Sequence, residues 1–330
     1  MKTIGLAVAF LIAASACSAS VGTGTLPLVK VADVPLGGRT TRMDYASYDQ
    51  GRRLLFIAHL GDSSVIVFDT QANRVVARIA GVKAVHGALA IPELGRVYAT
   101  ATGSNEVVAI DETTLKIVAR APTGEYPDGM AYAPEAHKLY VSNELGAAVT
   151  VVDVRSNMRK ATIALGGEVG NSQYDPVSRH VFANVQGLSQ LVEIDPATDT
   201  VVARIDLPGA RGNHGLLIDP QRRLAFIACE DNAKLLVLNL TTHRIVASFD
   251  VGRDPDVLAI DPEPGWVYVA SEAGVVSVFK AQAGTVTRIG EGMLGSNAHV
   301  VAVDPTSHLS YFPLKDLRGE TVLRIMRMQH

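Results

Sequence analysis

Short runs of apolar residues separated by turn-forming residues recur along the whole chain, and the segment from Pro127 to Ile163 shows the pattern in full. Its apolar runs predict four strands, which are Met130–Ala133, Lys138–Asn143, Val149–Val154 and Arg159–Ala164. Turns that contain Pro, Gly, Asn and Ser separate these strands. Strands of about 4–6 residues with such turns between them are typical of an antiparallel meander.

The four-strand unit is repeated from end to end, and an aromatic residue in its second strand marks each copy. These aromatic anchors are Phe56, Tyr98, Tyr140, Phe182, Phe226, Tyr268 and Tyr311. They lie 42–44 residues apart, and a proline stands six residues before six of them. A period of about 40–45 residues with four strands per copy is typical of a β-propeller, in which sheets called blades surround a central channel. The seven anchors therefore predict an all-β, seven-bladed β-propeller.

The two ends of the chain predict how the ring closes. After Tyr311 there is room for one more strand, Glu320–Met326, which leaves the last blade one strand short. The segment Leu28–Val34 precedes the first complete copy and resembles a fourth strand. We expect it to complete the last blade, because pairing the two ends removes exposed sheet edges. Pro313 interrupts the second strand of this blade, so we expect that strand to be short.

Short phrases in the second strands carry a family resemblance. They are Leu-Tyr-Val-Ser-Asn-Glu at 139–144, Val-Tyr-Ala-Thr at 97–100 and Val-Tyr-Val-Ala at 267–270, followed by strands of the type Val-x-Val-Val-Asp. From Leu28 to His330 the sequence resembles the YVTN-type (YncE-like) β-propeller repeats. The resemblance implies the same fold for this chain. It implies little about activity, because that family consists mostly of secreted and envelope proteins of diverse role.

The composition fits one domain of this kind. Apolar residues make up 48% and aromatic residues 5% of the 330 residues, which suits sheets packed by Val, Ile, Leu and Ala. The formal net charge is −3, without long runs of either sign, so binding to a phosphate backbone is not indicated. We expect a monomer with no nucleic-acid partner. No stretch after residue 20 is long and apolar enough to span a bilayer.

The N-terminal segment predicts export. Lys2 precedes the apolar run Ile4–Ala14, which has the length of a signal-peptide core. We expect residues 1–16 to be a signal peptide, residues 17–27 a tether, and residues 28–330 the propeller.

Cys17 decides between two exported forms. It directly follows Ala14-Ser15-Ala16 as in a lipoprotein box, although Ala14 stands where a bulky apolar residue is usual. Lipidation of Cys17 would give a periplasmic or outer-membrane-anchored lipoprotein that contacts the membrane only through its lipid. Plain cleavage would give a soluble secreted protein. In both cases Cys229 is the remaining thiol, so we expect no intramolecular disulfide.

One column of the repeat carries polar residues where an apolar strand begins. The residue twelve positions before each anchor, here called the rim column, is Asp44, His86, Asp128, Gly170, His214, Asp256 and His299. Strand packing requires neither Asp nor His there. The first strands of a propeller converge at one mouth of the channel, so these groups are the main candidates for a ligand site. Gly87, Gly129 and Gly215 follow three of them and would let a ligand approach the backbone closely.

The rim column also allows metal chemistry. His86, His214 and His299 come from blades two, five and seven, so they are spread almost evenly around the ring. Three converging imidazoles could bind Zn, Cu or Fe and leave a position open for water or substrate. In such an enzyme Asp128 or Asp256 would act as the base. Solvated rim residues without any ligand are the alternative.

The pairing of first and second strands predicts further candidates. If residue 219 faces residue 224 in blade five, then Cys229 faces His214. A Cys–His pair could be a nucleophile with its base or two soft metal ligands, whereas a packed, inert thiol is the alternative. The same register places three more residues on the rim, with His59 opposite Asp44, Asn143 opposite Asp128 and Ser271 opposite Asp256.

Charged residues near the rim bear on the type of ligand. Arg42, Arg211 and Arg253 lie just upstream of rim positions; if they turn inward, they favour an anionic ligand, and otherwise they are exposed loop residues. Three acidic residues, Glu144, Glu230 and Glu272, follow the second strands and are either solvated loop charges or walls of the pocket.

Two functions remain open from the sequence. The first is an exported cell-envelope binding or scaffold protein that engages a small molecule or an envelope protein partner at the channel mouth. The second is a metal-dependent hydrolase or lyase of the lactonase type with a His/Asp site at the hub. The sequence contains no Walker loop, Gly-x-Ser-x-Gly elbow, His-Glu-x-x-His or Cys-x-x-Cys motif, so it gives no support to the enzyme classes that use them.

Overall fold

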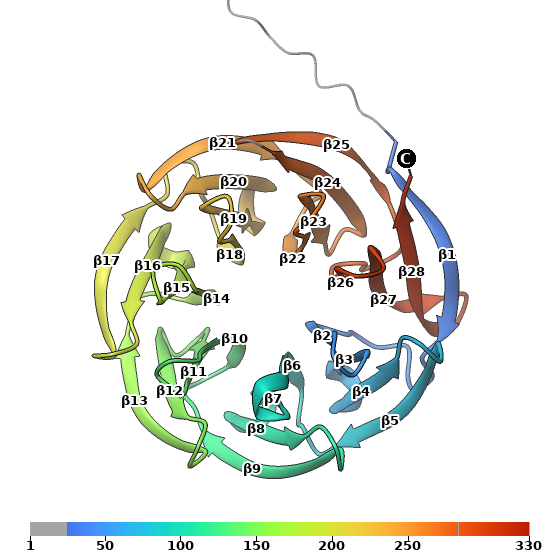
Figure 1. Cartoon of the computed structure of the whole chain (residues 1–330), viewed down its shortest axis with the longest axis horizontal. Helices are drawn as coiled ribbons and strands as arrows, with labels where there is room; N and C mark the ends of the chain where they lie inside the picture. The colour runs from blue at the N-terminus through green and yellow to red at the C-terminus, as the bar shows by residue number, and fades with distance from the viewer. Residues whose placement is uncertain (1–24, 283, 330) are drawn as a thin grey trace, which may run out of the picture.

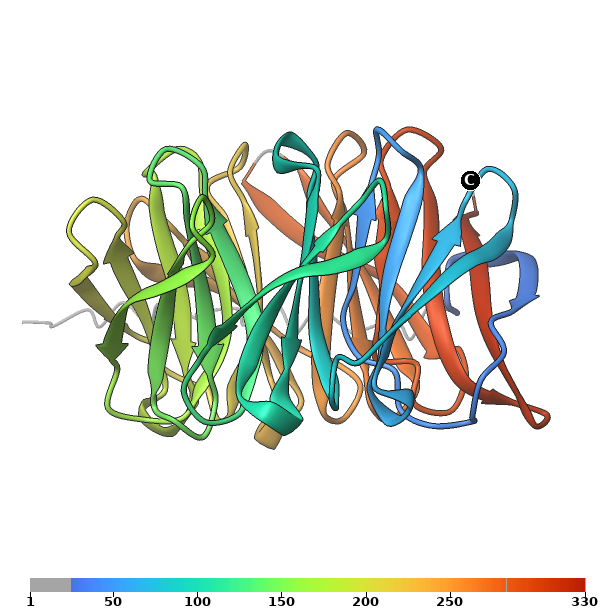
Figure 2. The same cartoon turned by 90° about the horizontal axis from the view of Figure 1, so that it is seen from below.

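The repeated meanders fold into seven four-stranded antiparallel sheets over residues 25–282 and 284–329, which are the residues that the computed structural model describes. Figure 1 shows these sheets as the blades of a closed ring, and Figure 2 shows the ring from the side as a disc with loops on both faces. The predicted seven-bladed propeller is confirmed. The predicted signal peptide and Cys17 lie outside the described residues.

Each of the first six blades uses four consecutive strands. They are β2 (Ala46–Asp49), β3 (Leu54–His59), β4 (Ser64–Asp69) and β5 (Arg74–Ala80); β6 (Val85–Ile91), β7 (Arg96–Ala101), β8 (Glu106–Asp111) and β9 (Lys116–Pro122); β10 (Pro127–Ala133), β11 (Lys138–Asn143), β12 (Ala148–Asp153) and β13 (Met158–Ala164); β14 (Val169–Asp175), β15 (His180–Val185), β16 (Gln190–Asp195) and β17 (Thr200–Asp206); β18 (Asn213–Asp219), β19 (Leu224–Cys229), β20 (Lys234–Asn239) and β21 (Arg244–Asp250); β22 (Pro255–Asp261), β23 (Trp266–Ser271), β24 (Val275–Gln282) and β25 (Thr285–Met293).

The seventh blade joins the two ends of the chain. It contains β26 (Ala302–Asp304), β27 (Leu309–Leu317), β28 (Glu320–Met328) and, as its outer strand, β1 (Leu28–Pro35). Within residues 25–282 and 284–329 there are also five single-turn 3₁₀ helices, each next to a second strand: η1 (Leu60–Asp62), η2 (Pro92–Leu94), η3 (Thr102–Ser104), η4 (Gln186–Leu188) and η5 (Glu230–Asn232).

The core lies between neighbouring blades. The seven aromatic anchors are at most 2% exposed, and in one such layer Tyr140 and Val151 of blade three pack with Val181 and Ile194 of blade four. The second and third strands are therefore buried on both faces, which explains their continuous apolar runs. The outermost strands, such as β21, alternate between exposed and half-buried residues. Face-to-face packing of the sheets leaves only their outer edges in water.

Ring closure depends on β1, which pairs with β28 as predicted. Nε and Nη2 of Arg324 donate to the two carboxylate oxygens of Asp33 at 2.7 and 2.9 Å. The N–H of Gln329 donates to the carbonyl of Pro27 at 2.9 Å, and Leu26 packs against the core of the last blades. Contacts with the propeller therefore include Pro27 and Leu26, which precede Leu28.

The second strand of blade seven corrects one prediction. β27 spans nine residues despite Pro313, so the expectation of a short strand is wrong. β26 pairs only with residues 309–311 of β27, so beyond Tyr311 that strand has a single partner, β28. Proline is tolerated where a strand lacks a neighbour on one side. In the part of the chain that the structure describes, no helix has the length and hydropathy needed to cross a bilayer.

Candidate functional site

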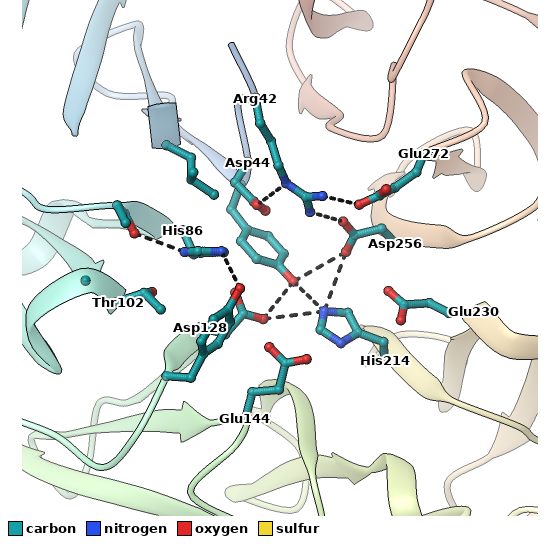
Figure 3. A pocket seen from close by; sticks show the side chains of 15 residues that line it. Arg42, Asp44, His86, Thr102, Asp128, Glu144, His214, Glu230, Asp256 and Glu272 are labelled. Carbon is teal, nitrogen blue, oxygen red and sulfur yellow. Dashed lines mark hydrogen bonds and ion pairs between the residues drawn. The ribbon is translucent and has the colours of Figure 1, made fainter. Parts of the chain in front are cut away.

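A cavity of about 610 Å³ lies at the hub of the ring (Figure 3). Its charged lining residues are Arg42, Asp44, His86, Asp128, Glu144, His214, Glu230, Asp256 and Glu272. Five of the six polar rim residues are among them. The sixth, His299, lies just beside the cavity, with Nε2 at 3.8 Å from a carboxylate oxygen of Asp256. The cavity has the size of typical small-molecule sites, which span about 300–1,000 Å³.

β-Bulges bring the rim residues to this cavity. In blade five, Asn213 faces Cys229 and Leu216 faces Ile227, so two residues of β18 oppose one residue of β19. The same register shift occurs in β6, β10, β14 and β22. In each case the two residues that oppose a single partner residue are the rim residue and the one after it. Bulges of this type redirect side chains and are common beside functional sites.

The glycines after rim residues serve the protein rather than a ligand. A Cβ on Gly87 would lie 2.5 Å from the carbonyl oxygen of Asp128, and one on Gly215 would lie 2.0 Å from that of Asp256. The next blade therefore already occupies the space that we expected a ligand to approach. Small residues are needed here because seven strands converge on one axis.

The phenol of Tyr45 is the centre of the hub network. Its oxygen lies 3.0 Å from Nε2 of His214, 3.2 Å from Asp128 and 3.4 Å from Asp256, and it accepts a hydrogen bond from Nδ2 of Asn171 at 2.8 Å. Burial, together with the nearby carboxylates, raises the pKa of Tyr45 well above its ordinary value. The phenol therefore keeps its proton and links blades one, three, four, five and six.

Tyr45 also divides the channel. It lines the hub cavity and a second cavity of about 210 Å³. The second cavity is lined by residues of the innermost strands, among them Ala88, Met130 and Leu258. A ligand in the hub cavity would therefore rest on the ring of Tyr45.

An ion pair sits beside this phenol. Nε2 of His214 lies 3.4 Å from Asp128 and 3.6 Å from Asp256. Burial opposes a charge on His214, but the hydrogen bond with Asp128 and the field of Glu230 raise its pKa well above its ordinary value. Burial also disfavours an ionised Asp128, yet the bond with His214 lowers the pKa of Asp128. Burial raises the pKa of Asp256 well above its ordinary value, so Asp256 is more easily protonated than Asp128, which forms the ion pair with His214.

Arg42 turns into the site and is already fully engaged. Its Nε donates to Asp44 at 3.0 Å, its Nη1 donates to Glu272, and its Nη2 lies 3.7 Å from Asp256. Burial opposes its charge, but these three carboxyl groups raise the pKa of Arg42. The other two predicted arginines, Arg211 and Arg253, are exposed, so the hub does not present a set of free guanidinium groups.

The acidic residues after the second strands are walls of the cavity. Glu144 and Glu230 are half-buried there. Burial raises the pKa of Glu144 to about 7, and burial also raises the pKa of Glu230. In the described part of the chain neither carboxylate has an ion-pair partner within 4 Å. Both face the cavity in Figure 3.

The three rim histidines do not form the predicted metal centre. Nδ1 of His86 bonds to the carbonyl of Ala84 at 3.0 Å, and its Nε2 bonds to the hydroxyl of Tyr126 at 3.1 Å. Each of the other two histidines instead belongs to a different acidic trio. The two trios are Asp44–Asp256–His299 and His214–Glu230–Asp256. In each trio, one potential ligand atom of every residue lies within 4.8 Å of those of the other two.

The predicted Cys229–His214 pair is wrong, and the bulge is the reason. The extra residue in β18 moves Cys229 opposite Asn213. The Cys229 side chain is fully buried among apolar residues such as Leu216 and Leu236. Burial raises the pKa of its thiol to about 12, so the structure favours the inert thiol over the nucleophile.

The same shift displaces the other residues expected opposite the rim. Asn143 faces Pro127 instead of Asp128, and Ser271 faces Pro255 instead of Asp256. The buried side chain of Asn143 bonds to the backbone of Gly124 and Ala148. It therefore holds loops together and does not line the cavity.

His59 is also absent from the cavity lining. Its Nε2 bonds to Thr41 at 3.0 Å and to the carbonyl of Arg39 at 3.1 Å, and its Nδ1 lies 3.3 Å from Asp62. These contacts hold the loop before β2 against the loop after β3. The structure thus gives His59 a local supporting role.

Tyr45, Asn171 and Tyr126 belong to the site but were not among the residues that we predicted from the sequence. A signal for the first two exists in the position after each rim residue, which is Gly in copies two, three and five and Val in copies six and seven, but Tyr45 in copy one and Asn171 in copy four. A large or polar residue in a column otherwise made of Gly and Val indicates a residue that fills the axis. Tyr126 lies in a loop and has no such signal.

Comparisons with known proteins agree with this fold. A family model described as YNCE-like beta-propeller matches residues 55–265. A search of curated proteins by sequence found no match. Among solved structures, Kuenenia stuttgartiensis hydrazine synthase is similar with a TM-score of 0.73 and 14% identity, covering 94% of this chain and 98% of that one. A chain of a mitotic checkpoint complex is similar with a TM-score of 0.77 and 12% identity, covering 99% of both. At 14% and 12% identity the two solved structures show only that the fold is shared. Because the family model matches more than half of the chain, the chain belongs to the YNCE-like β-propeller family.

Proposed function

We propose that this protein is an exported binding protein of the cell envelope and that its hub cavity binds a small organic cation, such as an amine. The observation that carries the proposal is the pair Glu144 and Glu230. Both carboxylates face the cavity, and among the described residues no basic side chain forms an ion pair with either of them within 4 Å.

The charge of the whole cavity supports the same class of ligand. Among the described residues that line it, six carboxyl groups stand against one guanidinium and two imidazoles. Arg42 is shared by three of the carboxyl groups, and His214 is paired with Asp128. The remaining negative charge is half-buried, where the repulsion among carboxylates is poorly screened. A cationic ligand relieves this repulsion, whereas an anionic ligand would increase it.

Two aromatic rings add to the fit for an ammonium group. Tyr45 and Tyr126 both line the cavity, and Tyr126 is held by its hydrogen bond to His86. The faces of aromatic rings attract organic cations by about 0.5–2 kcal/mol each. Carboxylates beside tyrosine rings are a suitable combination for an amine with an apolar body.

A thermal-shift series tests the proposed ligand class. Putrescine, spermidine and choline are compared with citrate and phosphate at constant ionic strength, because a ligand that binds the folded state raises its midpoint of unfolding. We expect at least one of the three cations to raise the midpoint and the anions to leave it unchanged. Stabilisation by the anions with no response to the cations would overturn the proposal.

A further inference from the structure

His299 has an unsatisfied ring nitrogen deep in the structure. The residue is 1% exposed, and its Nδ1 bonds to the carbonyl of Asn297 at 3.1 Å. This bond places the ring proton on Nδ1 and leaves a lone pair on Nε2. Among the described residues Nε2 has no hydrogen-bond partner. A buried polar atom without a partner is costly, so it points to a ligand.

The lone pair of Nε2 faces two buried carboxyl groups. Asp44 and Asp256 are 1% and 2% exposed, and their oxygens lie within 4.8 Å of Nε2 and of each other. The nearer one, Oδ2 of Asp256, is 3.8 Å away. Asp44 precedes β2, Asp256 lies in β22 and His299 precedes β26. The three residues therefore come from blades one, six and seven, which are consecutive around the ring.

From this geometry we propose a divalent transition-metal site formed by Asp44, Asp256 and His299. One imidazole with two carboxylates suits Zn²⁺, whose ligand atoms lie about 2.0–2.2 Å away and which leaves a fourth position for water. The bond between Nδ1 of His299 and a backbone carbonyl is the supporting contact that metal-binding histidines usually have.

His86 is a useful comparison within the same rim. Its Nδ1 is also bonded to a backbone carbonyl two residues earlier, but its Nε2 is occupied by Tyr126. The two histidines therefore share one backbone arrangement, and only His299 has a free nitrogen that faces carboxylates. This contrast selects His299 as the ligand.

The Arg42 guanidinium places its positive charge next to two of the proposed metal ligands, Asp44 and Asp256. Its Nε bonds to Asp44, and its Nη2 lies 3.7 Å from the same oxygen of Asp256 that faces His299. A metal ion and this guanidinium compete for the same two carboxyl groups. Replacing Arg42 by an uncharged residue removes the competitor and should strengthen metal binding, which is the opposite of what a general loss of structure would do.

The experiment is a titration of metal-free full chain with Zn²⁺ and, separately, Mg²⁺, followed by calorimetry and by the midpoint of thermal unfolding. We expect Zn²⁺ to bind at one equivalent and to raise the midpoint, because it would connect the three blades where the ring closes. His299→Ala should weaken Zn²⁺ binding at least tenfold, and Arg42→Gln should tighten it severalfold. His243→Asn, a change of an exposed histidine in a turn, should leave it unchanged.

Two results would overturn the site. One is Zn²⁺ binding that is the same in His299→Ala as in the wild type, and the other is Mg²⁺ binding as tightly as Zn²⁺, which would indicate a nonspecific acidic cluster. The Arg42→Gln variant keeps all three ligands, so weaker or unchanged Zn²⁺ binding in it contradicts the site even if His299→Ala folds poorly. Asp44 and Asp256 also line the hub cavity, whereas His299 does not, so the effect of His299→Ala on Zn²⁺ binding tests the metal site separately from the organic cation.

Discussion

The phenol oxygen of Tyr45 lies 3.0 Å from Nε2 of His214, although 169 residues separate the two along the chain. The contact crosses the hub from blade one to blade five. Hydrogen bonds of this kind connect the blades at the centre of the ring, whereas apolar layers between neighbouring blades stabilise the outer part. The cavity above it therefore has a floor set by several blades at once.

Removal of this hydroxyl should destabilise the fold. In Tyr45→Phe the groups around the phenol lose a partner while they stay buried, and one unsatisfied buried group costs about 1–3 kcal/mol. We expect the free energy of unfolding, measured by urea denaturation, to fall by that amount. Tyr48→Phe is the control, because the hydroxyl of Tyr48 lies away from the hub, 3.4 Å from Thr70 and near Asp304. An equal loss in both variants would contradict a special role for Tyr45.

Binding of an amine should depend on pH through Glu144. Its pKa is about 7, so the carboxyl group is neutral below that pH and negative above it. The affinity for putrescine, whose own charge is nearly constant here, should rise between about pH 6 and pH 8. Calorimetry at several pH values measures this rise. The profile should be flatter in Glu144→Gln, and an unchanged profile in that variant would exclude Glu144 as its source.

Glu112 should make the fold less stable as pH rises. It is 2% exposed, with Arg52 at 3.4 Å, and its oxygens have no hydrogen-bond partner among the described residues. Burial raises the pKa of Glu112 from 4.5 to about 7. The folded protein thus retains a proton that the unfolded chain releases above about pH 4.5, and stability declines between the two pKa values.

Glu112→Gln tests this linkage, because glutamine does not ionise. Between pH 5 and pH 8 the wild type should lose about 1–3 kcal/mol more of its free energy of unfolding than the variant. Chemical denaturation at both pH values measures the difference. Identical pH dependence in the two proteins would show that Glu112 ionises normally in the fold.

Ring closure should depend on Asp33. Its two-oxygen bond with Arg324 joins β1 to β28, and both side chains are mostly buried, at 19% and 16% exposure. We expect Asp33→Ala to lower the free energy of unfolding by about 1–3 kcal/mol, since bonds between charged groups exceed neutral ones. Asp250→Ala breaks the exposed pair with Lys234 and should cost less than about 1 kcal/mol. A larger effect at Asp250 would contradict this account of closure.

The ring itself was predictable because each blade repeats the same local rules. Aromatic anchors such as Tyr140 recur at a fixed period because every blade fills the same layer against its neighbour. The ends were predictable because Leu28–Val34 has no partner other than the incomplete last blade. The length of β27 was predicted wrongly from Pro313, because the effect of a proline depends on which side of the strand has a neighbour. The sequence does not show where β26 ends.

The sequence predicted where the rim residues would lie, but it predicted the contacts of their side chains only in part. Asp and His at strand starts indicated a polar hub, and five of the six side chains line the cavity. The bulge changes the register by one residue, which moved Cys229 away from His214. Whether a side chain is already bound by a neighbour, as His86 is by Tyr126, depends on loops from another blade. Periodicity along the chain does not contain that information.

Glu144 and Glu230, which have no ion-pair partner within 4 Å among the described residues, are the groups that we propose make the hub a site for an organic cation. Isothermal titration calorimetry of putrescine at pH 8 tests this directly. It compares the wild type, the double variant Glu144→Gln/Glu230→Gln and the control Glu93→Gln, which changes an exposed residue of η2. We expect one binding site in the wild type and in Glu93→Gln, and at least tenfold weaker binding in the double variant. Equal affinity in all three proteins would contradict it.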